Sequence, residues 1–400
     1  MQDILIPNLT KNKFSRFSFL LQTNYIFGLL VAVAALIAIK QYNHGSYNNY
    51  SIFKYTFWHL IESKSLYAHY PDEYWDRNHY GPVFALFIAP FALLPDYLGM
   101  LLWNVCSVLV FAFGIKSLPL SNNVKVIIAL ICANELITAL LSFQFNIFLT
   151  GAILIAFSYT LKNKNGIATF PIISCTMIKL YGIVGLAFFF FTQKKIQFIL
   201  GLIFWAVVLF VVPMLLSSPK FIIETYVEWF NTLVYKNSSN ISLDSYQDIS
   251  FMGMVRRSLG DPTIPNTPFL IGGVLLFGAT YLRIKQFQFL EFRLLLLAST
   301  LIFTVIFSSG SESPTYIIAF TGVAIWFMRK SQHSKWEIAL LIFAILLTSL
   351  SPTDLFPKVA RVFIRNHALK ALPCIIIWFT IIYEMLTKDF KPKSVTVCEN

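Results

Sequence analysis

Acidic side chains crowded among aromatic ones are the residues of this sequence best suited to proton transfer. One short stretch holds three acids and four aromatic residues: Asp72, Glu73, Asp76, Tyr70, Tyr74, Trp75 and Tyr80. An aromatic, partly dry setting raises the pKa of a carboxylate and so suits it to act as a general base. Aromatic faces also suit sugar rings. An amphipathic loop helix lying on a membrane would show the same pattern, and the sequence leaves both interpretations open.

A second group of polar residues interrupts long apolar runs, where polar side chains are costly and therefore suggest function. Lys179 stands between two such runs, within Cys175–Tyr181. It could be a lysine whose long stem reaches toward the membrane surface or anchors a helix end. It could also be a cation that holds an anionic phosphate in a cavity. Its position in the middle of a hairpin, away from the cationic links, favours the second interpretation.

Three further polar residues lie in short breaks of the apolar pattern. Gln144 and Asn146 could form a polar hairpin tip or an interhelical hydrogen bond. Glu312 stands among serines before Pro314 and could belong to a solvated loop beside a helix N-cap. An acid in a tight link between two spans is also well placed to line an outward-facing cavity.

The composition indicates which elements position these residues. The chain of 400 residues is 57% hydrophobic and 12% charged, with a mean hydropathy of +0.67. Soluble domains are about 25% charged, and apolar runs near ~18 residues indicate spanning helices. The sequence therefore predicts an all-α, polytopic transmembrane helical bundle. The net charge of +12 lies mostly in short links between apolar runs, which argues against nucleic-acid binding.

The distribution of lysine and arginine predicts the orientation. Residues 1–21 carry Lys11, Lys13 and Arg16, which places the N-terminus in the cytoplasm and the following span at roughly 22–40. One threading places every later cationic link, and the C-terminus, on the same side. These links are Lys162/Lys164, Lys194/Lys195, Arg283/Lys285/Arg293, Arg329/Lys330/Lys335 and Lys388/Lys391/Lys393.

With this threading the chain is a single integral membrane domain, 1–400, with three outer loops at about 41–80, 217–267 and 351–370. It requires that 81–95, which contains three prolines, is not a full span but a bent or re-entrant helix. The short runs 167–178 and 181–193 are expected to form a broken hairpin that enters a cavity. We expect about 11 to 13 helical segments.

The sequence lacks the motifs of several common active sites. It has no Gly-rich phosphate loop, no Ser/His/Asp elbow and no His/Cys metal cluster. We therefore expect no cofactor and no metal, and a phosphate-activated substrate would have to come from the membrane.

Five motifs, in order, resemble glycosyltransferase family 87, the polyprenol-phosphate-mannose-dependent mannosyltransferases of the GT-C superfamily. The resemblance covers most of residues 20–330. The motifs are His79–Leu86 followed by Ala89–Pro95 and Leu102–Asn104, Phe143-Gln144-Phe145-Asn146, Lys179, Gln247–Ser250 with Arg256, and Ser311–Tyr316.

The sequence departs from the family pattern at three places. Asn49 stands where the family has an acid, and an amide cannot take a proton from an acceptor hydroxyl. The base has therefore moved, with Asp76 or Glu73 as candidates, or the chain is an inactive relative. Phe143 replaces a glycine, and Glu312 stands where the family commonly has histidine.

The resemblance implies an inverting, metal-independent transfer of a hexose, mannose in this family, from a polyprenyl-phosphate donor to a lipid or glycan acceptor. Lys179 and Arg256 would stabilise the leaving phosphate, and a carboxylate (Asp76, Glu73 or Glu312) would be catalytic. The remaining substrate-binding candidates are Gln144, Asn146, Asn49, Tyr80 and Tyr316. Membrane lipids would surround the protein in a cell membrane, a bacterial inner membrane by this resemblance, with the active site extracytoplasmic.

Two other classes of function fit the same features. Broken helices and buried polar groups also occur in a transporter or flippase for lipid-linked sugars or small solutes. The absence of an internal repeat argues against it. A non-catalytic subunit of a surface-polysaccharide assembly system is the third possibility, which Asn49 keeps open.

Overall fold

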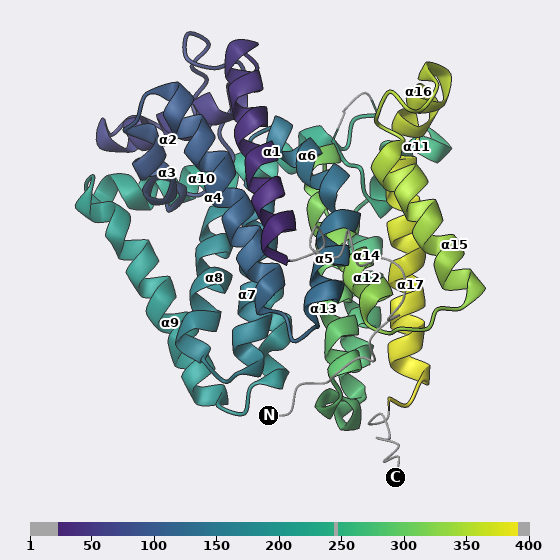
Figure 1. The fold of residues 1–400 in the computed structure, drawn as a ribbon. Coiled ribbons are helices and arrows are strands. Elements are labelled where there is room, and N and C mark those ends of the chain that lie inside the picture. Colours follow the sequence, from purple (N-terminus) through teal and green to yellow (C-terminus); the bar gives the residue numbers. More distant parts are fainter. Residues whose placement is uncertain (1–22, 244–246, 391–400) are drawn as a thin grey trace.

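The computed structural model describes residues 23–243 and 247–390 and shows a bundle of helices (Figure 1). The described part of the chain contains no β-strand. The predicted all-α, polytopic helical bundle is therefore confirmed. The N-terminal cations Lys11, Lys13 and Arg16, and Lys391 and Lys393 near the other end, lie outside the described residues.

Four helical segments in the described ranges are long and apolar enough to cross a membrane. They are Thr23–Asn43 (α1), Asp96–Ser117 (α4), Lys195–Leu215 (α9 with η2) and Leu369–Thr387 (η7 with α17). The pair α5 (Asn122–Ile131) and α6 (Ala133–Leu141), bent by 51°, can serve as a fifth. On α9 a run of large apolar side chains is exposed, as expected for a face in contact with lipid: Ile196, Leu200, Ile203, Phe204 and Val207. The chain is a multi-pass membrane protein.

Shorter helices complete the bundle and supply most of its buried core. They are α7 (Asn146–Leu161), α8 (Asn165–Ile178), η1 (Leu180–Phe191), α12 (Thr267–Ala279), α13 (Leu290–Ile306), α14 (Tyr316–Met328) and α15 (Lys335–Phe343) with η6 (Ala344–Leu350). Helices α13 and α14 are buried on nearly every side, which fits their almost uniform apolar composition. Helices α4 and α7 approach closely because Gly114 faces Gly151, where a Cβ on Gly114 would lie 2.7 Å from the Gly151 carbonyl oxygen.

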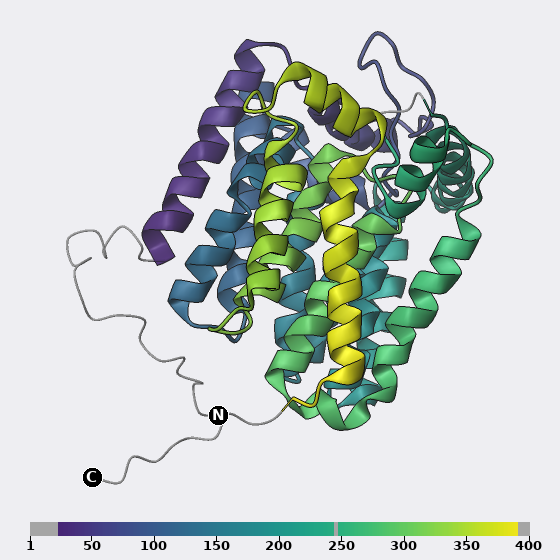
Figure 2. The same ribbon diagram turned by 90° about the vertical axis from the view of Figure 1, so that its right-hand side faces the viewer.

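Polar segments gather at one end of the bundle. This end carries α2 (Asn48–Ile61), α3 (Phe84–Ala92), α10 (Pro219–Asn240), α11 (Phe251–Leu259) and α16 (Lys358–Asn366), at the top of Figure 1. Figure 2 shows the same division from the side. Hydrogen bonds connect the segments of this end: among them, Trp229 Nε1 donates to the His79 carbonyl (2.9 Å), and Ile249 N donates to the Ser311 carbonyl (2.9 Å).

The cationic links gather at the opposite end and are also joined to one another. Arg283 donates to the carbonyl of Leu386 (2.7 Å), and Arg329 forms an ion pair with Glu384. Thr192 Oγ1 donates to Asn163 Oδ1 (3.2 Å). These contacts join links that are far apart in the sequence, and the side of the membrane on which they lie stays a prediction.

Two predicted short segments have the expected form. Helix α3 has nine residues and a proline at position 90, so at 1.5 Å per residue it spans about 14 Å and is too short to cross a bilayer of ~30 Å. Helices α8 and η1 form the predicted hairpin, and Lys179 is the extended residue between them (φ −144°, ψ 115°). The hairpin therefore places one cation at its break.

Candidate functional site

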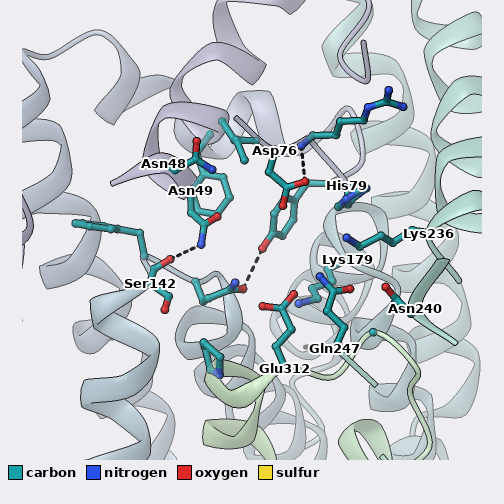
Figure 3. A pocket seen from close by; sticks show the side chains of 18 of the residues that line it. Asn48, Asn49, Asp76, His79, Ser142, Lys179, Lys236, Asn240, Gln247 and Glu312 are labelled. Carbon is teal, nitrogen blue, oxygen red and sulfur yellow. Dashed lines mark hydrogen bonds between the residues drawn. The ribbon is translucent and has the colours of Figure 1, made fainter. Parts of the chain in front are cut away.

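A cavity of about 990 Å³ opens at the polar end of the bundle (Figure 3). Its walls come from seven places: residues 45–53 at the start of α2, residues 75–80, the α6–α7 link, the α8–η1 break, the second half of α10, Gln247 and the link 308–314. These segments are far apart in the sequence, so the cavity depends on the assembled bundle. Six of the candidate residues line it: Asn49, Asp76, Tyr80, Gln144, Lys179 and Glu312.

Lys179 is held in the cavity wall by an amide and two aromatic rings. Its Nζ donates to Asn146 Oδ1 at 2.8 Å. The same ammonium group lies 4.7 Å from the ring centre of Tyr181 and 5.9 Å from that of Tyr80. No carboxylate within the described chain forms a direct ion pair with Lys179, so its positive charge remains available to a ligand.

Asn146 and Gln144 connect Lys179 to the opposite wall. Asn146 is fully buried, and its Nδ2 donates to Gln144 Oε1 (3.3 Å) and to the Pro314 carbonyl (3.3 Å). Tyr80 OH donates to the same Gln144 oxygen at 3.5 Å. Asn146 itself does not line the cavity. It therefore orients the lysine and ties it to the link that carries Glu312.

Gly81 fixes where Tyr80 lies relative to Lys179. The Gly81 amide donates to the Ile178 carbonyl at 2.9 Å, and a Cβ at this position would lie 2.0 Å from the Met177 carbonyl oxygen. Only glycine allows this close approach of two backbones. The first polar segment (residues 41–80) is thereby docked on the end of α8, next to Lys179.

Two carboxylates face the cavity from different segments. Asp76 reaches it from the first polar segment, and Glu312 reaches it from the link between α13 and α14. Burial raises the pKa of the Glu312 carboxyl, whereas nearby Lys179 and Lys236 act in the opposite direction. Asp76 Oδ1 accepts the Arg77 amide hydrogen at 2.8 Å, which leaves its second oxygen for a ligand.

Glu73 does not line this cavity. Its carboxylate lies 2.8 Å from Nε2 of His59, a residue of α2 that is 1% exposed. Both residues face a separate hollow of about 560 Å³ on another side of α2. Of the two candidates for a relocated base in the first polar segment, the structure brings only Asp76 to the main cavity.

Arg256 and Tyr316 also lie away from the cavity. Arg256 is 1% exposed and donates to the Asp248 carboxylate (Nε–Oδ2 3.2 Å) and to the Ile264 carbonyl (2.8 Å). Tyr316 is buried, and its hydroxyl donates to the Ile249 carbonyl (2.8 Å). These contacts hold the second polar segment (residues 217–267) in place.

The cavity also contains residues that the sequence did not single out. Lys236, on α10, and Arg77 add two cations, and His79 lines the cavity as well. Burial lowers the pKa of His79 to about 4, and Lys236 adds to this effect, so the ring is neutral at pH 7. Neither of its ring nitrogens has a hydrogen-bond partner in the described chain. The local sequence around Lys236 reads as an ordinary polar loop, so no signal distinguished it.

Phe143, which stands in place of the family glycine, has the backbone conformation that glycine favours. Its φ is +49°, in the left-handed region. The side chain is buried with its ring 6.0 Å from that of Tyr50, and its carbonyl accepts a hydrogen bond from Trp103 Nε1 (3.1 Å). Packing therefore maintains the turn that presents Gln144.

A buried ion pair supports the link that carries Glu312. Lys370 Nζ donates to both oxygens of Glu135 (3.1 and 3.0 Å) and to Ser313 Oγ (2.9 Å). Glu135 is fully buried in α6, and Lys370 is 4% exposed. Ser313 follows Glu312 directly, so the pair fixes one wall of the cavity from behind. The sequence analysis missed both residues because their partners are distant in the chain.

We predict that Lys370→Met destabilises the protein by about 3–5 kcal/mol, because it leaves the Glu135 carboxylate buried without a counter-charge. The measurement is the apparent Tm in one detergent at a fixed scan rate. The double variant Lys370→Met/Glu135→Leu removes both charges and is expected to recover most of the loss. An unchanged Tm in the single variant, or a lower Tm in the double variant, would contradict this account.

Comparison with known proteins gives one match. The sequence model of the family described as Glycosyltransferase family 87 matches residues 78–309, more than half of the 400-residue chain. Lys179, Gln144 and Lys236 lie within the matched range, whereas Asp76 and Glu312 lie just outside its two ends. No curated protein matches the sequence significantly.

Proposed function

Because the chain belongs to glycosyltransferase family 87 and is a membrane glycosyltransferase, we propose that it transfers a hexose from a polyprenyl-phosphate donor. The hexose is mannose, by the resemblance to the family. The acceptor is a hydroxyl of a lipid or glycan at the extracytoplasmic face. The observation that carries this proposal is the composition of the cavity: Lys179, Lys236 and Arg77 face it together with two carboxylates.

Lys179 and Lys236 are the groups we assign to the donor phosphate. Lys179 lies in the wall with a single neutral hydrogen-bond partner, and Lys236 projects toward the same space from α10. Cations in a partly desolvated site stabilise the charge that a phosphate gains as its bond to the sugar breaks. The proposal therefore needs no metal ion for leaving-group stabilisation.

Asp76 is the residue we assign as the general base. It belongs to the same polar segment as Asn49, where the family has its acid, and it lines the cavity together with Asn49. Asn49 donates through Nδ2 to the Ser142 carbonyl at 2.8 Å and has no proton-accepting carboxylate. Glu73 is engaged with His59 outside the cavity. Asp76 is thus the relocated base that the geometry favours.

The reaction is a single in-line displacement. The acceptor oxygen forms a bond to the anomeric carbon of the donor sugar, and its proton passes to Asp76. The bond between the anomeric carbon and the phosphate oxygen breaks, and the electron pair leaves with the polyprenyl phosphate. Attack opposite to the leaving group inverts the anomeric configuration.

The apolar surface of the bundle suits the lipid part of such a donor. The exposed large side chains of α9 run along the bundle toward α10, which carries Lys236. We propose that the polyprenyl chain enters laterally from the outer leaflet of a cell membrane, in a bacterium the inner membrane. The end with the cationic links, together with both termini, then lies in the cytoplasm.

The raised pKa of Glu312 predicts a pH dependence of donor binding. Below this pKa the carboxyl is neutral, and above it the anion repels the donor phosphate, which stays charged throughout. The donor Kd is therefore expected to rise in the wild type as the pH passes through this pKa, and Glu312→Gln is expected to lack this rise while it retains at least about a tenth of the transfer activity. Glu224→Gln, an exposed change on α10, is the control. Abolished transfer in Glu312→Gln would instead make Glu312 the base.

Competition for the donor site tests the proposed donor class. In nanodiscs, polyprenyl phosphate is expected to displace a labelled polyprenyl-phosphate-hexose, whereas nucleotide sugars are expected to have no effect. Equal displacement by a nucleotide sugar would overturn the donor assignment. The broken α8–η1 hairpin would also suit a transporter, and that alternative predicts movement of the donor across vesicles without cleavage.

A further inference from the structure

Two asparagines at the start of α2, Asn48 and Asn49, line the cavity. Each uses one polar atom of its side-chain amide in a hydrogen bond within the protein and leaves the other atom without a partner in the described chain. Asn48 Oδ1 accepts the Trp75 amide hydrogen at 2.9 Å, which turns its Nδ2 away from that contact. This Nδ2 is buried and has no hydrogen-bond partner in the described residues. Asn49 uses Nδ2 for the Ser142 carbonyl, which leaves Oδ1 as an acceptor. The two side chains thus offer one donor and one acceptor.

Gln144, in the α6–α7 link, is a third side-chain amide with only one of its two polar atoms in hydrogen bonds among the described residues. Its Oε1 accepts from Tyr80 OH and from Asn146 Nδ2, so Nε2 remains as a donor on the cavity side. A polar group of a protein that loses contact with water and gains no partner costs free energy. A ligand with hydroxyl groups, which both donate and accept, would satisfy all three amides.

An aromatic face lies beside these amides. Trp75 lines the cavity and is 74% exposed, although its backbone is fixed by the hydrogen bond to Asn48. A flat aromatic surface next to directional polar groups suits a pyranose ring, which has one apolar face and a rim of hydroxyls.

The cavity is divided by charge. Figure 3 shows Asn48, Asn49 and Ser142 on one side and the cations Lys179 and Lys236 on the other. Asp76 and Glu312 lie between the two sides. A base at Asp76 could therefore serve a hydroxyl bound on the neutral side while the phosphate is held on the cationic side.

We propose that the neutral side is an acceptor subsite and that the acceptor is a saccharide. The proposal rests on the transferase function above and assigns Asn48, Asn49, Gln144 and Trp75 to the acceptor sugar. It distinguishes this acceptor from a simple lipid alcohol, which would use neither the three amides nor the aromatic face.

Probes with the same alkyl chain test the acceptor class. Purified protein in nanodiscs is given a labelled polyprenyl-phosphate-hexose and either octyl α-mannoside, octyl β-glucoside or 1-octanol. We expect hexose transfer to at least one glycoside and none to octanol. Trp75→Ala is expected to raise the acceptor KM at least tenfold and to leave the donor KM within twofold, and Trp75→Phe is expected to restore it.

Asn48→Asp is the second variant, because it keeps the oxygen that accepts from Trp75 and replaces the free donor by a charged acceptor oxygen. It is expected to raise the acceptor KM in the same way without unfolding the loop. Use of octanol as well as a glycoside would overturn the inference, as would equal changes in donor and acceptor KM. Donor hydrolysis without transfer to any glycoside would also overturn it, yet would leave the donor assignment standing. A lack of any donor cleavage would instead count against the transferase function.

Discussion

Asp76→Asn is expected to lower the rate of hexose transfer by about 100- to 10,000-fold, the usual contribution of a general base. The amide keeps the shape of the side chain but cannot accept the proton of the acceptor hydroxyl. Donor binding is expected to persist, because the cations that hold the phosphate are unchanged. The measurement is single-turnover transfer together with the donor Kd of the same preparation.

Glu73→Gln is the matched control for Asp76→Asn. It removes a carboxylate from the same polar segment, three residues away, but from a side chain that faces His59 and the second hollow. Its transfer rate is expected to stay within about tenfold of the wild type. The assignment of the base would fail if Glu73→Gln lost transfer and Asp76→Asn kept it.

Lys179→Ala is expected to have the second large effect, a decrease of about 100- to 1,000-fold in kcat/KM for the donor. Its Nζ faces the cavity with only Asn146 as a hydrogen-bond partner in the described chain, so its charge is not compensated by an ion pair. Removing it takes away the cation that opposes the charge developing on the leaving phosphate. Steady-state kinetics with varied donor concentration measures this effect.

The control for Lys179→Ala is Lys220→Ala on α10, where the lysine side chain is 87% exposed and lies outside the cavity lining. It removes the same charge from the same end of the bundle and is expected to leave donor kinetics unchanged. An equal loss in both variants would show that only the overall potential of this end matters. Unchanged kinetics in Lys179→Ala would remove the lysine from the phosphate site.

Local sequence pattern predicted the features that depend on neighbouring residues. The apolar runs predicted the helical membrane bundle, and their short length around Lys179 predicted the broken hairpin of α8 and η1. The break in the apolar pattern at Gln144 and Asn146 predicted a polar link between two helices. In the structure Gln144 lines the cavity, and Asn146 accepts a hydrogen bond from Lys179. These predictions succeeded because a polar residue inside an apolar run is energetically costly unless it finds a partner, and such residues therefore gather at polar sites.

Features that depend on the assembled bundle could not be predicted in this way. Arg256 resembled a phosphate ligand by its order in the chain, but it is buried on α11 and pairs with Asp248, in the segment just before this helix. Glu135 and Lys370 are 235 residues apart, and neither local context indicates the other. Lys236 reaches the cavity because α10 packs across the first polar segment. A hydrogen bond from Trp229 of α10 to the His79 carbonyl is part of this contact.

The most direct test of the central claim is transfer of a labelled hexose from a polyprenyl-phosphate donor by the purified protein in nanodiscs. We predict formation of free polyprenyl phosphate and a glycosylated acceptor with inverted configuration, and loss of both in Asp76→Asn. A folded protein that neither transfers nor hydrolyses the sugar of any polyprenyl-phosphate hexose would contradict the account and would favour a transporter or a non-catalytic subunit.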